Sequence, residues 1–186
     1  MNRRNLVFVI VLLIGLVLDQ VTKLWIVANL PEGGGEIRLI PGLFSIVHRQ
    51  NPGAAFGMFR DWEYRHWMFV AFTVLAAGVI LDLFRRLPTT DRFMAATLGL
   101  ILSGAVGNAI DRIHKQTVTD FLKVYTDIPA LKTVLIRMVG TNEWPSFNIA
   151  DSALVIGVLM YVFHSLFLEE KAAEPAPGQT APPNAG

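Results

Sequence analysis

The chain has 186 residues, of which 53% are hydrophobic and only 17% are charged, whereas about 25% of residues are charged in a typical globular protein. Sixteen basic and fifteen acidic side chains leave a net charge of +1, which provides no basic field to attract nucleic acid. The sequence has no cysteine, which excludes disulfides, thiolate metal sites and a cysteine nucleophile, and the composition predicts a small integral membrane protein.

Four segments are apolar over the roughly 20 residues that a membrane-spanning helix requires. The first, 6–28, follows Arg3 and Arg4 and begins like a secretory signal, but it continues into Asp19 without a small-residue cleavage site. We therefore interpret it as a retained span. The other three segments are 67–84, 93–110 and 149–168. The sequence thus predicts an all-α membrane protein with four transmembrane helices, formed by residues 1–168.

The basic residues predict how these helices cross the membrane. Arg85, Arg86 and Arg92 crowd the short link between the second and third spans, whereas the long links 29–66 and 111–148 dilute their basic residues with acidic ones. Because the positive-inside bias acts mainly through short links, we expect both termini in the cytoplasm and both long links on the extracytoplasmic face.

The long links contain short segments with strand character. Residues 37–40 and 43–48 are rich in β-branched side chains and are separated by Pro41-Gly42, which predicts a small extracytoplasmic β-sheet element. Trp62 and Trp67 suit the membrane interface. Residues 131–139 are compatible with either a strand or a short surface helix. The tail 169–186 is rich in proline and alanine and is expected to be a disordered cytoplasmic segment.

Polar side chains from distant segments converge at the extracytoplasmic end of the predicted spans. They are Asp19, Lys23, Asn51, Asn108, Asp111, Arg112, Asp120, Asn148 and Asp151. We expect all of them except Lys23 to line one cavity near the outer interface. Charged groups at membrane depth are costly and usually face a cavity or one another. Structural explanations exist for single members: Asp19 can neutralise Lys23, Asp111 can pair with Arg112, and Asp151 can cap the fourth span. They do not explain why all members share one end of the membrane.

The third predicted span carries small residues at four-residue spacing. Ala95, Gly99, Ser103 and Gly107 form one stripe, and Gly104 lies on an adjacent stripe with Asn108 and Arg112. Small residues allow a neighbouring helix to approach closely. The polar end of this span is therefore expected to pack against another helix.

Several kinds of catalytic site can be discounted. Ser103 lies on the packing stripe and no Gly-x-Ser-x-Gly elbow occurs, which argues against a serine hydrolase. The four histidines are scattered without a His-Glu-x-x-His pattern, and no glycine-rich phosphate loop is present. We therefore expect no metal and no cofactor. A carboxylate pair remains, which can share a proton and activate water, and Asp19, Asp111, Asp120 and Asp151 are the candidates.

Five ordered motifs resemble those of the bacterial lipoprotein signal peptidases, also called signal peptidase II. They are Asp19-Gln20-x-Thr22-Lys23, then Asn51-Pro52-Gly53-Ala54-Ala55-Phe56-Gly57, Gly104-Ala105-Val106-Gly107-Asn108-Ala109-Ile110-Asp111-Arg112, Val118-Thr119-Asp120-Phe121 and Phe147-Asn148-Ile149-Ala150-Asp151-Ser152. Each motif alone is weak, but the ordered set across residues 19–152 is specific.

The resemblance implies a membrane-embedded aspartyl endopeptidase that cleaves prolipoproteins immediately before the diacylglyceryl-modified lipobox cysteine. By the same resemblance, Asp120 and Asp151 form the catalytic dyad, and the remaining matched residues bind substrate or support the site. That second set contains Asp19, Lys23, Asn51, Gly104, Asn108, Asp111, Arg112 and Asn148. The implied partners are prolipoproteins and membrane lipids, and the implied protein is a monomer of the bacterial inner membrane, with its active site near the extracytoplasmic face.

One feature departs from the family pattern, and one alternative function stays open. The 25 residues 122–146 between Phe121 and Phe147 form a longer link than the family leads us to expect. A small proton-coupled carrier or channel also uses intramembrane carboxylates. It would require polar residues in both membrane halves or an inverted repeat, whereas the inner halves of the last three spans contain only Asp82 and His164 near their ends.

Overall fold

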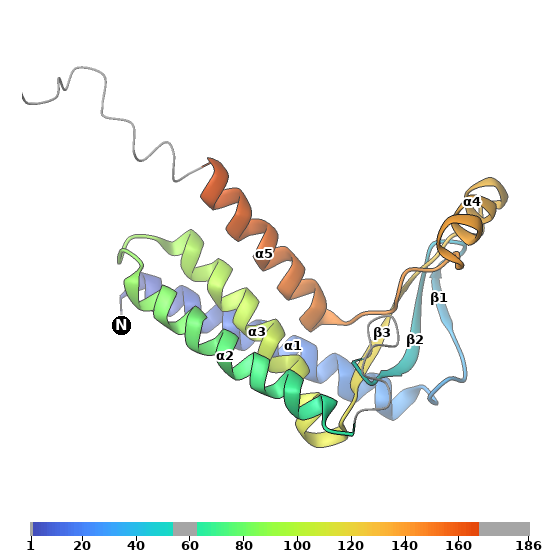
Figure 1. Ribbon diagram of the computed structural model, residues 1–186, viewed down its shortest axis with the longest axis horizontal. Helices are drawn as coiled ribbons and strands as arrows, with labels where there is room; N and C mark the ends of the chain where they lie inside the picture. Colours follow the sequence, from blue (N-terminus) through green and yellow to red (C-terminus); the bar gives the residue numbers. More distant parts are fainter. Residues whose placement is uncertain (1, 54–62, 168–186) are drawn as a thin grey trace, which may run out of the picture.

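The computed structural model describes residues 2–53 and 63–167, and four of its helices are long and apolar enough to cross a membrane (Figure 1). These are α1 (Arg3–Asn29), α2 (Arg65–Arg86), α3 (Arg92–Lys115) and α5 (Ile149–Phe167). The expected four-helix membrane fold is confirmed. The first three helices extend beyond the predicted apolar segments because their end turns carry polar residues such as Arg3 and Lys115. The expectations for Trp62 and the tail 169–186 lie outside the described residues.

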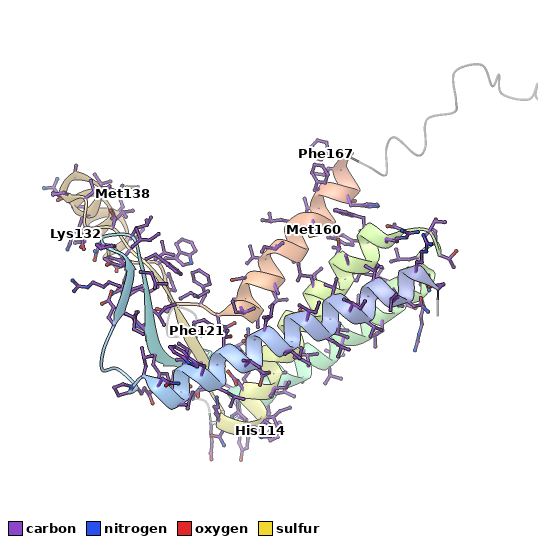
Figure 2. The ribbon with its side chains drawn as sticks, turned by 180° about the vertical axis from the view of Figure 1, so that it is seen from behind. His114, Phe121, Lys132, Met138, Met160 and Phe167 are labelled. Atoms are coloured by element: carbon purple, nitrogen blue, oxygen red, sulfur yellow. The ribbon has the colours of Figure 1, made fainter. Side chains whose placement is uncertain are left out.

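Helix α3 is the centre of the bundle, and α1, α2 and α5 all pack against it. A Cβ atom at Gly99 would lie 2.8 Å from the carbonyl oxygen of Phe8 in α1, and a Cβ atom at Gly104 would overlap the carbonyl oxygen of Ala150 in α5. The two small-residue stripes therefore face different neighbours, as close packing requires. By contrast, α1, α2 and α5 expose many large apolar side chains outward from the bundle, among them Phe167, which is labelled in Figure 2.

The two long links join in a three-stranded antiparallel sheet of order β1-β2-β3. The predicted hairpin is present as β1 (Ile37–Ile40) and β2 (Phe44–Asn51). The third strand, β3 (Val118–Val124), was not predicted; it pairs with β2 so that Arg49 lies opposite Asp120 and Asn51 opposite Val118. A bridge between Leu122 and Phe147 then brings the start of α5 against β3.

The segment for which strand and helix were both open forms the short helix α4 (Pro129–Val139). Pro129 occupies its first turn, where the fixed φ of proline suits a helix start. Gly140 ends it with a φ of 80°, a left-handed conformation that glycine adopts without steric cost. Figure 1 shows α4 at the far edge of the sheet, away from the four long helices.

Candidate active site

Asp120 occupies the middle of β3 and is only 3% exposed. Its two carboxyl oxygens accept hydrogen bonds from separate amides, Oδ2 from Asn51 Nδ2 at 2.9 Å and Oδ1 from Asn148 Nδ2 at 2.8 Å. Burial raises the pKa of Asp120 to about 7, although both of these hydrogen bonds oppose the shift. A carboxyl group with this pKa can give or take a proton at neutral pH.

Asp151 and Asn148 form a reciprocal cap at the start of α5. The backbone N–H of Asp151 donates to Asn148 Oδ1 at 2.9 Å, and the backbone N–H of Asn148 donates to Asp151 Oδ2 at 3.1 Å. This pairing satisfies backbone groups that a helix start otherwise leaves unpaired. The expected cap therefore exists, with Asn148 as its first member, and the second carboxyl oxygen of Asp151 accepts a bond from Asn108 Nδ2 at 2.7 Å.

Asn148 connects the two aspartates, because it contacts Asp151 through its backbone and Asp120 through its side chain. It is fully buried, and its amide also approaches Asn108 Oδ1 at 3.1 Å and the carbonyl oxygen of Thr119 at 3.3 Å. The carboxyl groups of Asp120 on β3 and Asp151 on α5 thus both accept hydrogen bonds from one residue, Asn148.

A buried ion cluster lies beside Asp120, Asn148 and Asp151. Lys23, which is 1% exposed, contacts Asp19 at 2.9 Å, Asp111 at 3.3 Å and Asn108 Oδ1 at 3.0 Å. Asp19 does neutralise Lys23, as the structural explanation proposed, but it also accepts a bond from the backbone N–H of Ala150 at 2.9 Å. Asp111 accepts a bond from the backbone N–H of Thr119 at 3.0 Å. The cluster therefore links α1 to the start of α5 and to β3, immediately beside both aspartates.

A cavity of about 610 Å³ opens over Asp120. Its lining residues are Arg49, Gln50, Asn51, Pro52, Gly53, Phe69, Arg112, Asp120, Pro145 and Ser146. Of the side chains expected to share one cavity, Asn51, Arg112 and Asp120 line it. Asp151, which is half-buried, lies outside its lining, as do the almost fully buried Asp19, Asn108, Asp111 and Asn148. The expectation that all eight side chains line one cavity is therefore met only in part, and the four buried residues can position the groups at the surface without reaching the cavity themselves.

The wall of this cavity contains the cationic side chain of Arg112 and the hydroxyl group of Ser146. The Arg112 guanidinium lies 4.7 Å above the ring centre of Phe69 and donates to the carbonyl oxygen of Asn108 at 3.3 Å. The Ser146 hydroxyl oxygen is buried and has no hydrogen-bond partner among the described residues. Within those residues, no group of three histidine or carboxylate side chains is placed to hold a metal ion.

Sequence reasoning missed three contributors to the site. Thr119, which supplies a backbone donor to Asp111, lies within a quoted motif and was detectable there. Gln20 also lies within a motif and donates to the carbonyl oxygen of Gly107 at 3.2 Å. Phe69 gave no signal, because one aromatic residue in an apolar span looks like any other lipid-facing side chain.

Comparisons with known proteins give matches that cover most of the chain. The family model described as signal peptidase (SPase) II matches residues 11–167. The lipoprotein signal peptidase of Geobacter metallireducens is 42% identical over 154 residues, which cover 83% of this chain and 86% of the relative. That of Geobacillus kaustophilus is 36% identical over 151 residues, which cover 81% and 87%.

Two solved structures share the fold. One, described as a bacterial membrane enzyme determined by the in meso method at 1.9 Å resolution, is 28% identical, with a TM-score of 0.71 and coverage of 86% of this chain and 92% of the other. A second bacterial membrane enzyme, determined by the same method at 2.3 Å, is 26% identical with a TM-score of 0.73, covering 92% and 94%.

Proposed function

The chain belongs to the signal peptidase II family, and on this premise we propose that Asp120 and Asp151 are the catalytic dyad of an aspartyl endopeptidase. As a family member, the protein is a multi-pass peptidase of the bacterial inner membrane that removes signal peptides from prolipoproteins. We further propose that it cleaves immediately before the diacylglyceryl-modified cysteine of the lipobox.

One observation supports the dyad above all others. Asp120 on β3 and Asp151 on α5 both bond to Asn148, although 31 positions separate them in the sequence. Of the other two carboxylates that the sequence offered, Asp19 and Asp111 are both engaged with Lys23. Asp120 and Asp151 are therefore the pair left for proton transfer.

The proposed reaction needs one protonated and one ionised carboxyl group. Two close carboxyl groups do not readily ionise together, so they share one proton. The pKa of about 7 at Asp120 and the position of Asp151 at the positive end of the α5 dipole assign that proton mainly to Asp120. For coupled groups this assignment describes the dominant microstate of the pair.

In the proposed hydrolysis of the peptide bond, the dyad takes up one proton and gives up another. The ionised carboxylate takes a proton from water as the water oxygen bonds to the scissile carbonyl carbon. The protonated carboxyl group gives its proton to the amide nitrogen as the C–N bond breaks. The products are the signal peptide with a free carboxyl group and the lipid-modified cysteine with a free amino group, and the dyad again holds one proton.

The remaining site residues divide by position. Asn51 and Arg112 line the cavity and are placed to hold the substrate backbone, while Asn108 holds Asp151. Asp19, Lys23, Asp111 and Asn148 are positioning residues, because each acts through another member of the site. Gly104 supports the site by allowing α5 to approach α3.

The proposed orientation places the site near the extracytoplasmic face and both termini in the cytoplasm. Arg3 and Arg4 at the start of α1 and the basic link between α2 and α3 lie at one end of the bundle, opposite to the sheet (Figure 1). The positive-inside bias supports a cytoplasmic location for that end. We also propose that the protein acts as a monomer.

Cleavage of a defined substrate by the purified protein tests this proposal. In detergent, the protein should cut a diacylglyceryl-modified lipobox peptide before the cysteine and leave the unmodified peptide largely intact. The same preparation in vesicles should carry no proton current under an imposed pH gradient. A proton flux without cleavage would instead identify the carrier or channel that intramembrane carboxylates also permit.

A further inference from the structure

Helix α4 has an apolar face that the protein leaves uncovered. Leu131, Val134, Leu135, Met138 and Val139 share one side of this helix at three- and four-residue spacing, and we call them the α4 apolar face. None of the 11 residues of α4 is buried, and Met138 and Val139 are 76% and 66% exposed. An isolated helix of this length is marginally stable in water, so a second surface must cover it.

The adjacent sheet does not provide that surface. An apolar groove of about 370 Å³ separates α4 from the β1–β2 turn, the end of β3 and the chain that follows α4. Its apolar lining includes Leu43, Val124, Leu131, Leu135, Val139 and Trp144. Trp144, at the edge of the groove, is 68% exposed. Large contiguous apolar surfaces of this kind mark a contact with a protein or with a membrane.

The position of α4 indicates which contact this is. The sheet extends sideways from the end of the bundle, and α4 lies at its outer edge, beside the axis of the four long helices and not above them (Figure 1). Figure 2 shows the labelled Lys132 and Met138 on this displaced helix. Because α1, α2, α3 and α5 fix the position of the bilayer, α4 is placed over the lipid beside the bundle, at the level where the spans end.

The charges and aromatic residues of α4 and its flanks fit a lipid surface. The helix contains Arg137 and Lys132 and no acidic residue, although Lys132 contacts Asp127, which precedes the helix, at 3.4 Å. Arg137 therefore provides the main positive charge for a leaflet that carries anionic headgroups. Thr133 and Arg137 occupy the side opposite the α4 apolar face. Trp144 has the amphipathic ring that membrane interfaces favour.

We propose that α4 is an interfacial helix that inserts the α4 apolar face into the outer part of the leaflet at the site end of the bundle. The partner is the phospholipid bilayer itself, and the apolar groove faces acyl chains in place of water. Because only residues 125–128 separate the end of β3 from α4, this contact fixes the far end of the strand that carries Asp120. The inference does not depend on the proposed peptidase mechanism.

Site-directed spin labelling tests this placement directly, since the chain has no native cysteine. We would attach a nitroxide to Met138→Cys and, in a second protein, to Val139→Cys, with Thr133→Cys as the matched control on the opposite side. Each variant is reconstituted into vesicles of phosphatidylethanolamine and phosphatidylglycerol. Collision with oxygen, which concentrates in the bilayer, is compared with collision with a water-soluble nickel chelate.

The labels at positions 138 and 139 should show an oxygen-to-nickel accessibility ratio several-fold higher than the label at position 133. Equal ratios at all three positions would overturn the proposal, because both sides of α4 would then lie in the same medium, water if the ratios are low and the bilayer interior if they are high. Spin–spin broadening at position 138 that disappears when unlabelled protein is added would also overturn it, because a second copy of the chain would then cover the helix.

Discussion

The side-chain amide of Asn148 donates to Oδ1 of Asp120 at 2.8 Å, so the residue that caps α5 also holds the carboxyl group on β3. A helix start and a strand from different parts of the chain are thereby joined at the proposed reaction centre. This relationship makes the geometry of the dyad depend on a cap, on a buried ion cluster and on one helix–helix contact, and each dependence can be measured.

Replacing either dyad residue by asparagine should abolish catalysis while the fold is kept. Asparagine is nearly isosteric with aspartate but cannot transfer a proton, and acid–base catalysis contributes about 10²–10⁴ in rate. Asp120→Asn and Asp151→Asn should each slow single-turnover cleavage of a lipidated lipobox peptide by at least that factor. Asp82→Asn is the matched control, because Asp82 is exposed and pairs with Arg86 on α2. Near-normal turnover in either dyad variant would refute the mechanism.

The pKa of Asp120 predicts how stability depends on pH. In the folded protein this pKa is about 7, above the ordinary value of 3.8, so the folded state binds more protons than the unfolded state between these limits. The free energy of unfolding should therefore fall as pH rises from about 4 to about 7, by at most about 1.4 kcal/mol per pH unit from this group. Thermal melting in detergent should show this decline in the wild type and a flatter profile in Asp120→Asn. Identical slopes would mean that Asp120 titrates near its ordinary pKa.

Removing the buried cation should destabilise the protein far more than removing an exposed one. Lys23→Met leaves Asp19 buried without its counter-ion and Asp111 with Lys115 alone, and loss of one partner from a buried ion pair costs about 3–5 kcal/mol. Lys115→Met removes a longer contact of 3.5 Å to Asp111 from a side chain that is 33% exposed, which should cost less than about 1 kcal/mol. Chemical denaturation of the two variants under the same conditions compares them. Similar losses would show that the cluster does not support the bundle.

The contact between α3 and α5 should tolerate no added methyl group at Gly104. A Cβ atom there would overlap the carbonyl oxygen of Ala150, so Gly104→Ala should push the helices apart and separate Asn108 from Asp151. We expect a lower melting temperature and slower cleavage. Gly78→Ala on α2 is the control, since a Cβ atom there has no described neighbour within 4 Å and alanine favours a helix by up to about 1 kcal/mol. An unchanged Gly104→Ala protein would contradict the proposed packing.

The four spans and the β1–β2 hairpin were predictable because each depends on a local pattern. The apolar length of α1 and the Pro41-Gly42 turn are readable within about 20 residues of sequence. The site residues were also identified as a group, since polar residues at membrane depth are rare. Their division into cavity-lining residues such as Arg112 and buried residues such as Asn148 was not predictable, because it depends on which helices meet.

The sequence did not predict strand β3 or decide that α4 is a helix, and each failure has its own physical reason. β3 alternates too weakly to stand out, and its strand character comes from pairing with β2, which is distant in sequence. The α4 segment is a short apolar run, for which periodicity alone does not separate strand from helix. Its helical state is fixed by Pro129 and Gly140 at its two ends, and these boundary residues were the available signal.

The cap shared by Asn148 and Asp151 also sets the order in which the protein becomes functional during synthesis. Without the first turn of α5, Asn148 has no fixed position from which to reach Asp120, and Asp19 lacks the backbone donor of Ala150. A nascent chain with its first three spans in the membrane therefore carries Asp120 without Asn148 and without Asp151. On the proposed mechanism, the dyad is complete only when the fourth span enters the bilayer, so a partly made chain should be unable to cut the proteins around it.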